Sequence, residues 1–276
     1  MVRVEMLAVG KELLIGRTLN TNAHWVGGRL ARKGTMLKEV TTIDDDLEEI
    51  SSAIRNILRR SPDFLVVVGG LGPTPDDMTL EGIAKGLGVK MKPNAKALAL
   101  IKEHYGKRGM QDVELTPARR KMSVLPEGAE PVVNEVGTAP GVRLAVGGTM
   151  MYSLPGVPAE MKSIYSRSVE PEIIAKLGLL HRKYLRFKLE GILESVLAPI
   201  ISVELRKHPA AYVKSHPRGM REGVSRIELD IAVVGEEAKH TNEEALHLAG
   251  EMTRAIVEAG GTVKSARSGR ARRSVT

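Results

Sequence analysis

The sequence contains no cysteine among its 276 residues. This absence excludes disulfides and thiolate chemistry, so any metal site must use carboxylates, histidines or backbone oxygens. Such oxygen-rich ligand sets favour hard cations such as magnesium. No apolar run approaches the roughly 20 residues that a membrane-spanning helix needs, and the first ten residues carry no cleavable signal. These absences predict a cytoplasmic protein that has no membrane partner.

Aromatic residues are also scarce, at 3% of the chain, whereas the net charge is +8. A positive excess can indicate nucleic-acid binding, but five basic residues lie together near the C-terminus, namely Lys264, Arg267, Arg270, Arg272 and Arg273. Without them the net charge is only +3, and no aromatic residue lies among them to stack on bases. We therefore predict that residues 265–276 are a solvated, disordered tail and that nucleic acid is not a partner. Weak nonspecific RNA or DNA contact is the less favoured interpretation.

Strand-like and helix-like segments alternate from the N-terminus to about residue 172. The continuously apolar run FLVVV predicts a strand that is covered on both faces. Gly147 and Gly148 predict a hairpin that delivers a further strand into the loop PGVP and then a helix. Such β-α repetition is typical of a doubly wound, mostly parallel sheet, whose ligands bind at the carboxyl ends of the strands. We assign this α/β domain to residues 1–174.

A smaller pattern occupies residues 180–264. It reads strand, helix, strand, strand, helix, strand, which predicts a split β-α-β sandwich of the α+β class. The chain therefore consists of a larger and a smaller domain, as its length also suggests.

The segment GGLGPTPDD, residues 69–77, follows the apolar strand and allows two interpretations. In the structural one, Thr74 is a helix N-cap, Pro75 takes the first helical position and Asp77 completes a capping box. In the functional one, Gly69, Gly70 and Gly72 let the backbone approach a phosphate.

The adjacent carboxylates of Asp76 and Asp77 bear on the functional interpretation. A carboxylate about 4 Å from a phosphate would cost about 4 kcal/mol per charge pair at an effective dielectric of about 20. A divalent cation between the two groups reverses that sign. The functional interpretation therefore predicts a phosphate loop with a metal that Asp76 and Asp77 hold.

Further candidates lie at other predicted strand ends. Glu12 follows the first strand, and Asp44, Asp45 and Asp46 precede a helix, where most such runs are a solvated helix start. Asn20 or Asn22 is expected to cap the next helix. The turns in NEVGTAPG and LPGVPAEM expose backbone, and they supply the candidate nucleotide contacts Asn134, Gly137, Thr138, Pro155 and Gly156, to which we add Asn22.

Other polar residues receive only structural interpretations. Glu160 is read as a first-turn acid, and Arg119 to Lys121 as a solvated helix face. The seven histidines show no ligand spacing such as HExxH, so they are assigned no role. No nucleophile motif such as GxSxG occurs, which excludes covalent serine or cysteine catalysis of the known kinds.

Four segments occur in the order and rough spacing of one family: GKELLIGRTLNTNAHWV, GGLGPTPDDMT, PEGAEPVVNEVGTAPG and LPGVPAEM. Over residues 2–172 the chain thus resembles the first domain of the CinA (competence-damage-inducible protein A) family, which lies in the molybdopterin-binding MoCF, MogA/MoeA-like superfamily. The segment EGILESVLAPII resembles, less specifically, the middle domain of the same family. The resemblance implies a three-layer α/β/α domain followed by a small α+β domain.

By this resemblance, the first domain is expected to be a metal-dependent pyrophosphatase that splits ADP-ribose or a similar dinucleotide into AMP and ribose 5-phosphate. The acid that handles metal and phosphate falls on Asp77, and the strand-end pair falls on Asp45 and Glu12. The glycine loop binds phosphate, with Thr74 as a hydroxyl donor. Magnesium, manganese or cobalt is the expected cofactor.

A second expectation stays open, namely a molybdopterin- or nucleotide-binding protein without hydrolytic activity. Asp76 stands where the MogA-like branch has a basic residue, which favours the CinA branch. Full-length family members carry a C-terminal nicotinamide mononucleotide deamidase domain, and this chain ends before one could begin, so no deamidase activity is expected. Superfamily members are commonly oligomeric, which predicts a homodimer or homotrimer.

Overall fold

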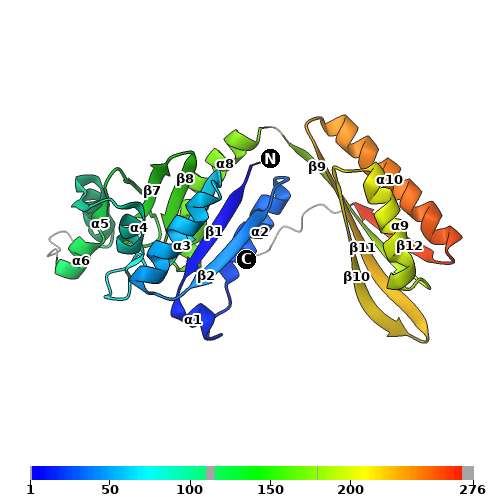
Figure 1. The fold of residues 1–276 in the computed structure, drawn as a ribbon, viewed down its shortest axis with the longest axis horizontal. Coiled ribbons are helices and arrows are strands. Elements are labelled where there is room, and N and C mark those ends of the chain that lie inside the picture. The colour runs from blue at the N-terminus through cyan, green and yellow to red at the C-terminus, as the bar shows by residue number, and fades with distance from the viewer. Residues whose placement is uncertain (1, 110–115, 179, 269–276) are drawn as a thin grey trace. The chain divides into compact units, whose positions relative to one another are not determined.

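A computed structural model describes residues 2–109, 116–178 and 180–268 (Figure 1). The chain divides into two compact units. The first contains Met1–Ala31 and Thr35–Gly178, and the second contains Arg32–Gly34 and Leu179–Thr276. No helix in the described residues is long and apolar enough to cross a membrane.

A six-stranded sheet forms the centre of the first unit. Its strands, from edge to edge, are β2 (Leu37–Ile43), β1 (Val4–Val9), β3 (Phe64–Val68), β8 (Thr149–Leu154), β7 (Gly141–Val146) and β6 (Glu130–Val132). The first four strands run parallel, and β7 and β6 add an antiparallel edge. The predicted hairpin is confirmed, because Val146 pairs with Thr149 across Gly147 and Gly148. Every residue of β3 is buried, as its apolar sequence indicates.

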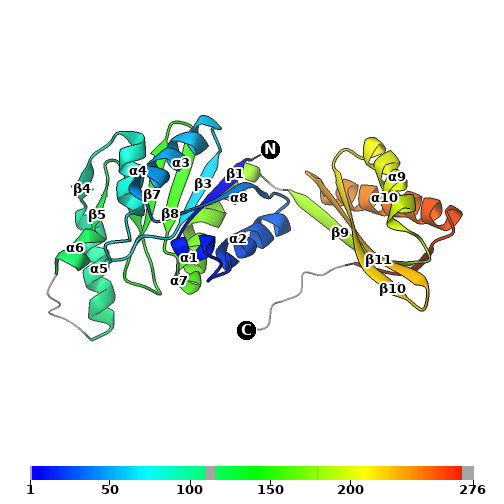
Figure 2. The same ribbon diagram turned by 60° about the horizontal axis from the view of Figure 1, so that its bottom comes forward.

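Helices cover both faces of this sheet (Figure 2). Successive strand residues point to opposite faces, so Phe64 and Val66 of β3 join one hydrophobic cluster and Leu65 and Val67 join another. The first cluster packs against α2 (Thr21–Arg32), α7 (Pro158–Ile164), the π-helical turn η1 (Tyr165–Val169) and α8 (Glu170–Leu177). The second packs against α3 (Leu47–Arg59), α4 (Thr79–Leu87) and α5 (Ala95–Lys107). The expected three-layer α/β/α fold is therefore confirmed.

Four shorter elements complete the first unit. They are α1 (Lys11–Leu14), α6 (Pro117–Lys121), and the antiparallel pair β4 (Met91–Pro93) and β5 (Val124–Pro126).

The second unit is a four-stranded antiparallel sheet with two helices. Its elements are β9 (His181–Glu190), α9 (Glu194–Lys207), β10 (Ala211–Arg221), β11 (Val224–Gly235), α10 (Ala238–Glu258) and β12 (Thr262–Ser268). The strand order is β10, β11, β9, β12, so the predicted β-α-β-β-α-β arrangement is confirmed. Leu197 of α9 and Leu248 and Met252 of α10 share one core with Leu229 and Ile231 of β11.

Strand β12 corrects the boundary of the expected disordered tail. Its backbone pairs with β9 as far as Ser268, which lies opposite Leu185. Residues 265–268 are therefore part of the sheet, because the free edge of β9 supplies backbone partners that the basic composition does not reveal. Residues 269–276 lie outside the described part of the chain.

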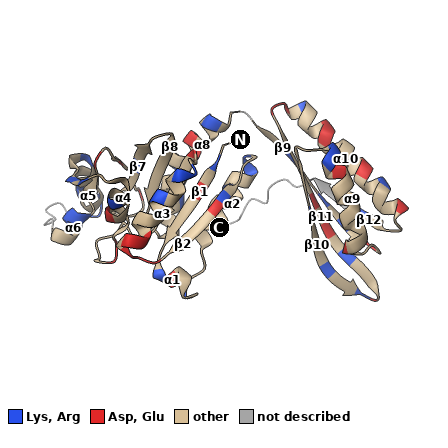
Figure 3. Cartoon of the chain, viewed as in Figure 1, with Lys and Arg blue, Asp and Glu red and all other residues tan. Residues whose placement is uncertain are grey.

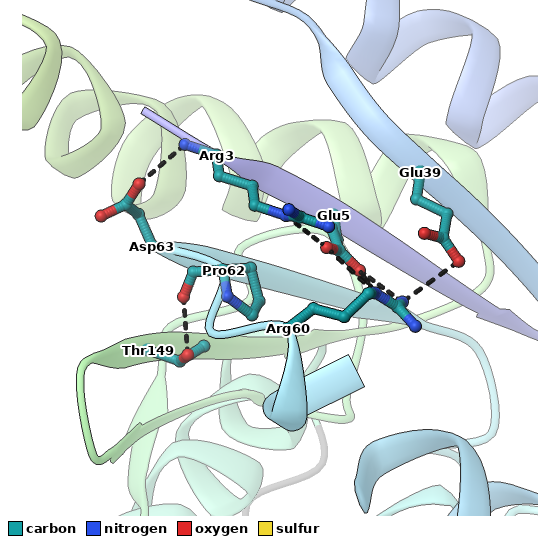
Figure 4. Close-up of polar contacts among 7 residues, drawn as sticks. All are labelled: Arg3, Glu5, Glu39, Arg60, Pro62, Asp63 and Thr149. Carbon is teal, nitrogen blue, oxygen red and sulfur yellow. Dashed lines mark hydrogen bonds and ion pairs between the residues drawn. The ribbon is translucent and has the colours of Figure 1, made fainter. Parts of the chain in front are cut away.

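One buried acid, Glu5, lies within β1 with 1% of its surface exposed. Figure 4 shows two arginines directed at it. Arg60 Nη2 lies 2.5 Å from Glu5 Oε2, and Arg3 Nε lies 2.7 Å from Glu5 Oε1. Burial by itself raises the pKa of Glu5, but the hydrogen bonds from Arg60 and Arg3 outweigh it and hold the pKa below its usual value. The ion pair between Arg60 and Glu5 thus attaches the end of α3 to β1.

We predict that Arg60→Ala lowers the free energy of unfolding of the first unit by about 2 kcal/mol at pH 7, because a buried carboxylate loses its closest cationic donor. Unfolding is followed by the fluorescence of Trp25, the only tryptophan, which packs edge-on against Tyr165. Since the pKa of Glu5 is lower in the folded state, the loss should shrink as the pH falls below 4.5, the usual glutamate value.

The matched control is Arg59→Ala, because Arg59 is exposed and its polar contact within the described residues is a 3.5 Å one with Asn56 in the same helix. It should change the stability by less than about 0.5 kcal/mol. Equal losses for the two variants at pH 7 would contradict the assigned role of Arg60.

Candidate functional site

The four parallel strands end at one level of the sheet. Ala8 of β1 pairs with Thr42 of β2 and with Val68 of β3, and Val68 pairs with Leu154 of β8. The loops that follow these strands therefore meet at the same edge, where doubly wound sheets bind ligands.

These loops enclose a cavity of about 530 Å³. Its lining includes the predicted site residues Glu12, Asp45, Gly69, Gly70, Gly72, Asp76, Asp77, Thr138, Pro155 and Gly156, and in addition Gly10, Tyr105, Met122 and Glu160. The structure thus brings ten of the predicted residues from five separate chain segments into one cavity.

The acids of the cavity are held in place although they repel one another. Asp45 Oδ2 accepts a hydrogen bond of 2.9 Å from the backbone N–H of Lys11, which joins the loop after β2 to the loop after β1. Burial raises the pKa of Asp45, and the negative charges of Glu12, Asp44 and Asp76 raise it further. The neighbouring acids thus form a field that favours a cation or a proton. Figure 3 shows acidic positions at the start of α3, which directly follows this loop.

The glycine loop needs its glycines for steric reasons. Gly70 has a φ of 64°, and its carbonyl accepts from the N–H of Thr79 at 3.2 Å. A Cβ at Gly70 would collide with the Thr79 hydroxyl. That hydroxyl oxygen is buried and has no hydrogen-bond partner in the described chain. The loop backbone is therefore packed closely onto the first turn of α4.

The capping interpretation of Thr74 is wrong. Helix α4 begins at Thr79, and its N-cap, Met78, provides no side-chain cap. The side chain of Asp77 instead turns back, and its Oδ2 accepts from the Thr74 N–H at 2.9 Å and from the Thr74 hydroxyl at 2.5 Å. These two hydrogen bonds close the loop before the helix starts. They occupy Oδ2, so Oδ1 is the oxygen of Asp77 that is left for a ligand.

Lys121 has more than the solvated role predicted for its helix face. Its ammonium group donates to the Thr74 carbonyl at 2.7 Å. The charge of Lys121 is thereby fixed on the glycine loop.

Asn22, near the start of α2, supports the part of the cavity wall that Gly156 forms. Asn22 Nδ2 donates to the Gly156 carbonyl at 2.8 Å, while Asn20 takes the predicted capping role by accepting from the N–H of Ala23. The side-chain oxygen of Asn22 is buried and has no hydrogen-bond partner among the described residues.

Glu160 of α7 is a cavity residue that the sequence interpretation missed. Asn134 Nδ2 donates to Glu160 Oε2 at 2.7 Å, and Asn134 Oδ1 accepts from the Gly137 N–H at 2.9 Å. A Cβ at Gly137 would occupy the space of the Glu160 carboxylate. The sequence signal that could have identified Glu160 as a cavity residue was its position directly after the rigid turn PGVPA. No sequence signal indicated that Tyr105 would line the cavity.

Four predicted residues therefore support the cavity rather than line it, namely Asn22, Thr74, Asn134 and Gly137. The contacts show what each holds: Asn22 fixes Gly156, Thr74 fixes Asp77, and Asn134 with Gly137 fixes Glu160.

The cavity acids suit a hard divalent cation in chemistry, because all of them offer carboxylate oxygens and their mutual repulsion would be relieved by positive charge. Within residues 2–109, 116–178 and 180–268, however, only His208, His247 and Glu251 of the second unit have three ligand atoms within 4.8 Å of one another. The cavity acids thus share a space without forming a compact three-ligand set.

Residues 5–175 match the sequence profile of a family described as a probable molybdopterin binding domain. A protein of Metallosphaera sedula is 42% identical over 259 residues, which cover 94% of this chain and 96% of that protein. A protein of Thermoplasma acidophilum is 39% identical and is covered over 100% of its length. The crystal structure of CinA, a protein of unknown function from Thermoplasma acidophilum, is similar to this chain with a TM-score of 0.57 and 44% identity. That comparison covers 62% of this chain and 99% of the other.

We predict that Gly70→Ala destabilises the first unit by about 2–4 kcal/mol, because left-handed strain and the collision with Thr79 add together. Gly88→Ala is the matched control, since Gly88 has a φ of 69° but open space around it. It should cost only about 1–2 kcal/mol. Denaturant unfolding followed by Trp25 fluorescence compares the two, and equal losses would contradict the tight packing of the loop.

Proposed function

Because the chain belongs to the family of probable molybdopterin binding domains through residues 5–175, we propose that its cavity binds a nucleotide and hydrolyses the pyrophosphate bond of ADP-ribose or a similar dinucleotide. The observation that carries this proposal is the meeting of a glycine loop with the acids Glu12, Asp45, Asp76 and Asp77 in one cavity. A phosphate loop surrounded by carboxylates is electrostatically favourable only when a cation neutralises them. The proposed cofactor is therefore magnesium, manganese or cobalt.

The reaction adds one water across the bridging P–O–P linkage. A new P–O bond forms at one phosphorus, the bond between that phosphorus and the bridging oxygen breaks, and the products are AMP and ribose 5-phosphate. The bound cation would supply charge neutralisation and polarisation of a phosphoryl oxygen. Asp76 and Asp77 are its proposed protein ligands, with Glu12 nearby.

The chain's own residues have three tasks in this proposal. Gly70 to Gly72 line the cavity, and their backbone N–H groups are the proposed donors to phosphate oxygens. Asp45 accepts a proton from the attacking water, as a carboxylate that the Lys11 N–H holds at the cavity. Thr74 holds the carboxylate of Asp77 in the loop, and Asn134 holds that of Glu160 across the cavity.

A second candidate is a binding protein for molybdopterin or a related pterin nucleotide that performs no hydrolysis. Two observations favour it: the description of the matching family, and the absence of a compact three-ligand set among the described cavity acids. In this case the acids would position donor groups of the ligand, as carboxylates do in many nucleotide sites.

We predict that the purified protein releases AMP from ADP-ribose in the presence of magnesium, manganese or cobalt and releases none after chelation. Asp45→Asn and Asp77→Asn should each lower the rate by about 100-fold or more. Both changes keep an oxygen that can accept the hydrogen bonds of Lys11 and Thr74, so the loops should keep their conformation. AMP release is measured by chromatography.

Glu48→Gln is the matched control. Glu48 lies three residues after Asp45 but pairs with Lys85 and does not line the cavity. Its rate should stay within about twofold of the original. If the folded protein releases no AMP with any of the three metals, the pyrophosphatase proposal is wrong for this substrate.

The second candidate makes a different prediction. The folded protein should then bind a pterin nucleotide, detected by fluorescence of the pterin after release by denaturation, whether or not a divalent ion is present. Gly72→Val should weaken this binding, because a side chain there would run into the Asp77 carboxylate beside the cavity. Failure to bind any pterin nucleotide would contradict this candidate.

A further inference from the structure

A second cluster of ligating side chains lies in the second unit, away from the motifs described above. His208 is the C-cap residue of α9 and is buried, and its backbone N–H donates to the Glu204 carbonyl at 3.1 Å. His247 and Glu251 lie one turn apart on α10, so their side chains share one face of that helix. The fold brings His208 onto this face although 39 residues separate it from His247.

The distances in this cluster are close to those around a metal ion. His208 Nε2 lies 2.9 Å from Glu251 Oε2, and His247 Nδ1 lies 3.7 Å from the same oxygen. All three ligand atoms lie within 4.8 Å of one another. In a tetrahedral zinc site with bonds of about 2.0–2.2 Å, ligand atoms stand about 3.3–3.5 Å apart. The observed separations bracket that value, so shifts of less than about 1 Å would complete such a site.

A carboxylate lies next to the second ring nitrogen of His208, as is usual for metal-bound histidines. Glu244 Oε1 lies 3.5 Å from His208 Nδ1, the nitrogen that faces away from Glu251. A carboxylate at this nitrogen orients the ring and makes the opposite nitrogen a better ligand. Glu244 also lies on α10, so one helix supplies two ligands and the outer partner.

The charge balance also favours a cation. Glu204, Glu244 and Glu251 bring three carboxylates, and Lys207 is the basic residue that contacts two of them, at 3.0 Å from Glu204 and 3.7 Å from Glu251. With neutral histidines the group keeps two negative charges, and a divalent ion would neutralise them. Figure 3 shows further acidic positions along α10.

A simpler interpretation is a protonated His208 paired with Glu251. It accounts for the raised pKa of His208, whose main cause is the hydrogen bond to Glu251. It gives no role to His247, whose ring lies 5.7 Å from that of His208 although its side chain is 66% exposed. The two interpretations therefore differ at His247.

We propose that His208, His247 and Glu251 bind a divalent transition-metal ion such as Zn²⁺, with an open position for water. Two imidazole nitrogens and one carboxylate suit Zn²⁺, Co²⁺ or Ni²⁺ better than the magnesium expected in the other unit. The ion attaches the C-terminal end of α9 to the middle of α10.

Isothermal titration of the chelator-stripped full chain with Zn²⁺ tests this site. The wild-type protein should bind one Zn²⁺ at the cluster. His247→Ala should weaken this binding by at least about tenfold, because loss of an outer partner alone costs about 10–100-fold. Since His247 is exposed, its replacement leaves the core of the unit intact. Co²⁺ titration gives a second readout, as bound Co²⁺ absorbs visible light according to its ligands.

His181→Ala is the matched control, because His181 is an exposed histidine of the same unit that lies on β9, outside the cluster. It should leave Zn²⁺ affinity and the Co²⁺ spectrum unchanged. Asp77→Asn should also leave the Zn²⁺ affinity of the cluster unchanged, which separates this site from the cavity of the first unit. The proposal is overturned if the wild-type chain binds no Zn²⁺, or if His247→Ala binds it as tightly as His181→Ala does.

Discussion

The position of β1 between two parallel neighbours is the constraint on which the candidate site depends. Ala8 of β1 pairs with Thr42 on one side and with Val68 on the other, so three strands end level with one another. Every loop that follows must then begin at the same edge of the sheet. Glu5 reinforces this arrangement, because its ion pairs with Arg3 and Arg60 attach β1 to the end of α3 (Figure 4). The site is thus a consequence of strand register.

The same register creates an electrostatic cost. Carboxylates that are far apart along the chain are brought into one cavity, and the pKa of Asp45 is raised as a result. Local hydrogen bonds hold these acids in place: Lys11 donates its backbone N–H to Asp45, Thr74 donates to Asp77, and Asn134 donates to Glu160. The proposed cation or a ligand rich in donors would supply the opposite charge.

The second unit differs from the first in its sheet and in its polar residues. Its antiparallel sheet has both helices packed into one core, and none of the site residues predicted from the sequence lies in it. Its polar cluster forms where the end of α9 meets α10, through His208, His247 and Glu251. The two units therefore present different donor chemistry, with oxygen donors in the first and mainly nitrogen donors in the second. The difference in ligand softness would favour different metals at the two proposed sites.

The sequence by itself determined the order and type of the elements, because hydrophobic periodicity and turn residues act over a few neighbours. It predicted the buried strand at residues 64–68, the hairpin at Gly147, and the order of elements in both units. Local patterns also placed most candidate residues at strand ends. They failed in the glycine loop, where Thr74 binds Asp77 three residues further on instead of capping the helix. They also failed for contacts between distant segments, because residues 265–268 pair with β9 and Glu160 and Tyr105 reach the cavity. Only the tertiary structure decided those contacts and the meeting of His208 with His247, because distances between residues far apart in sequence are set by packing and strand pairing.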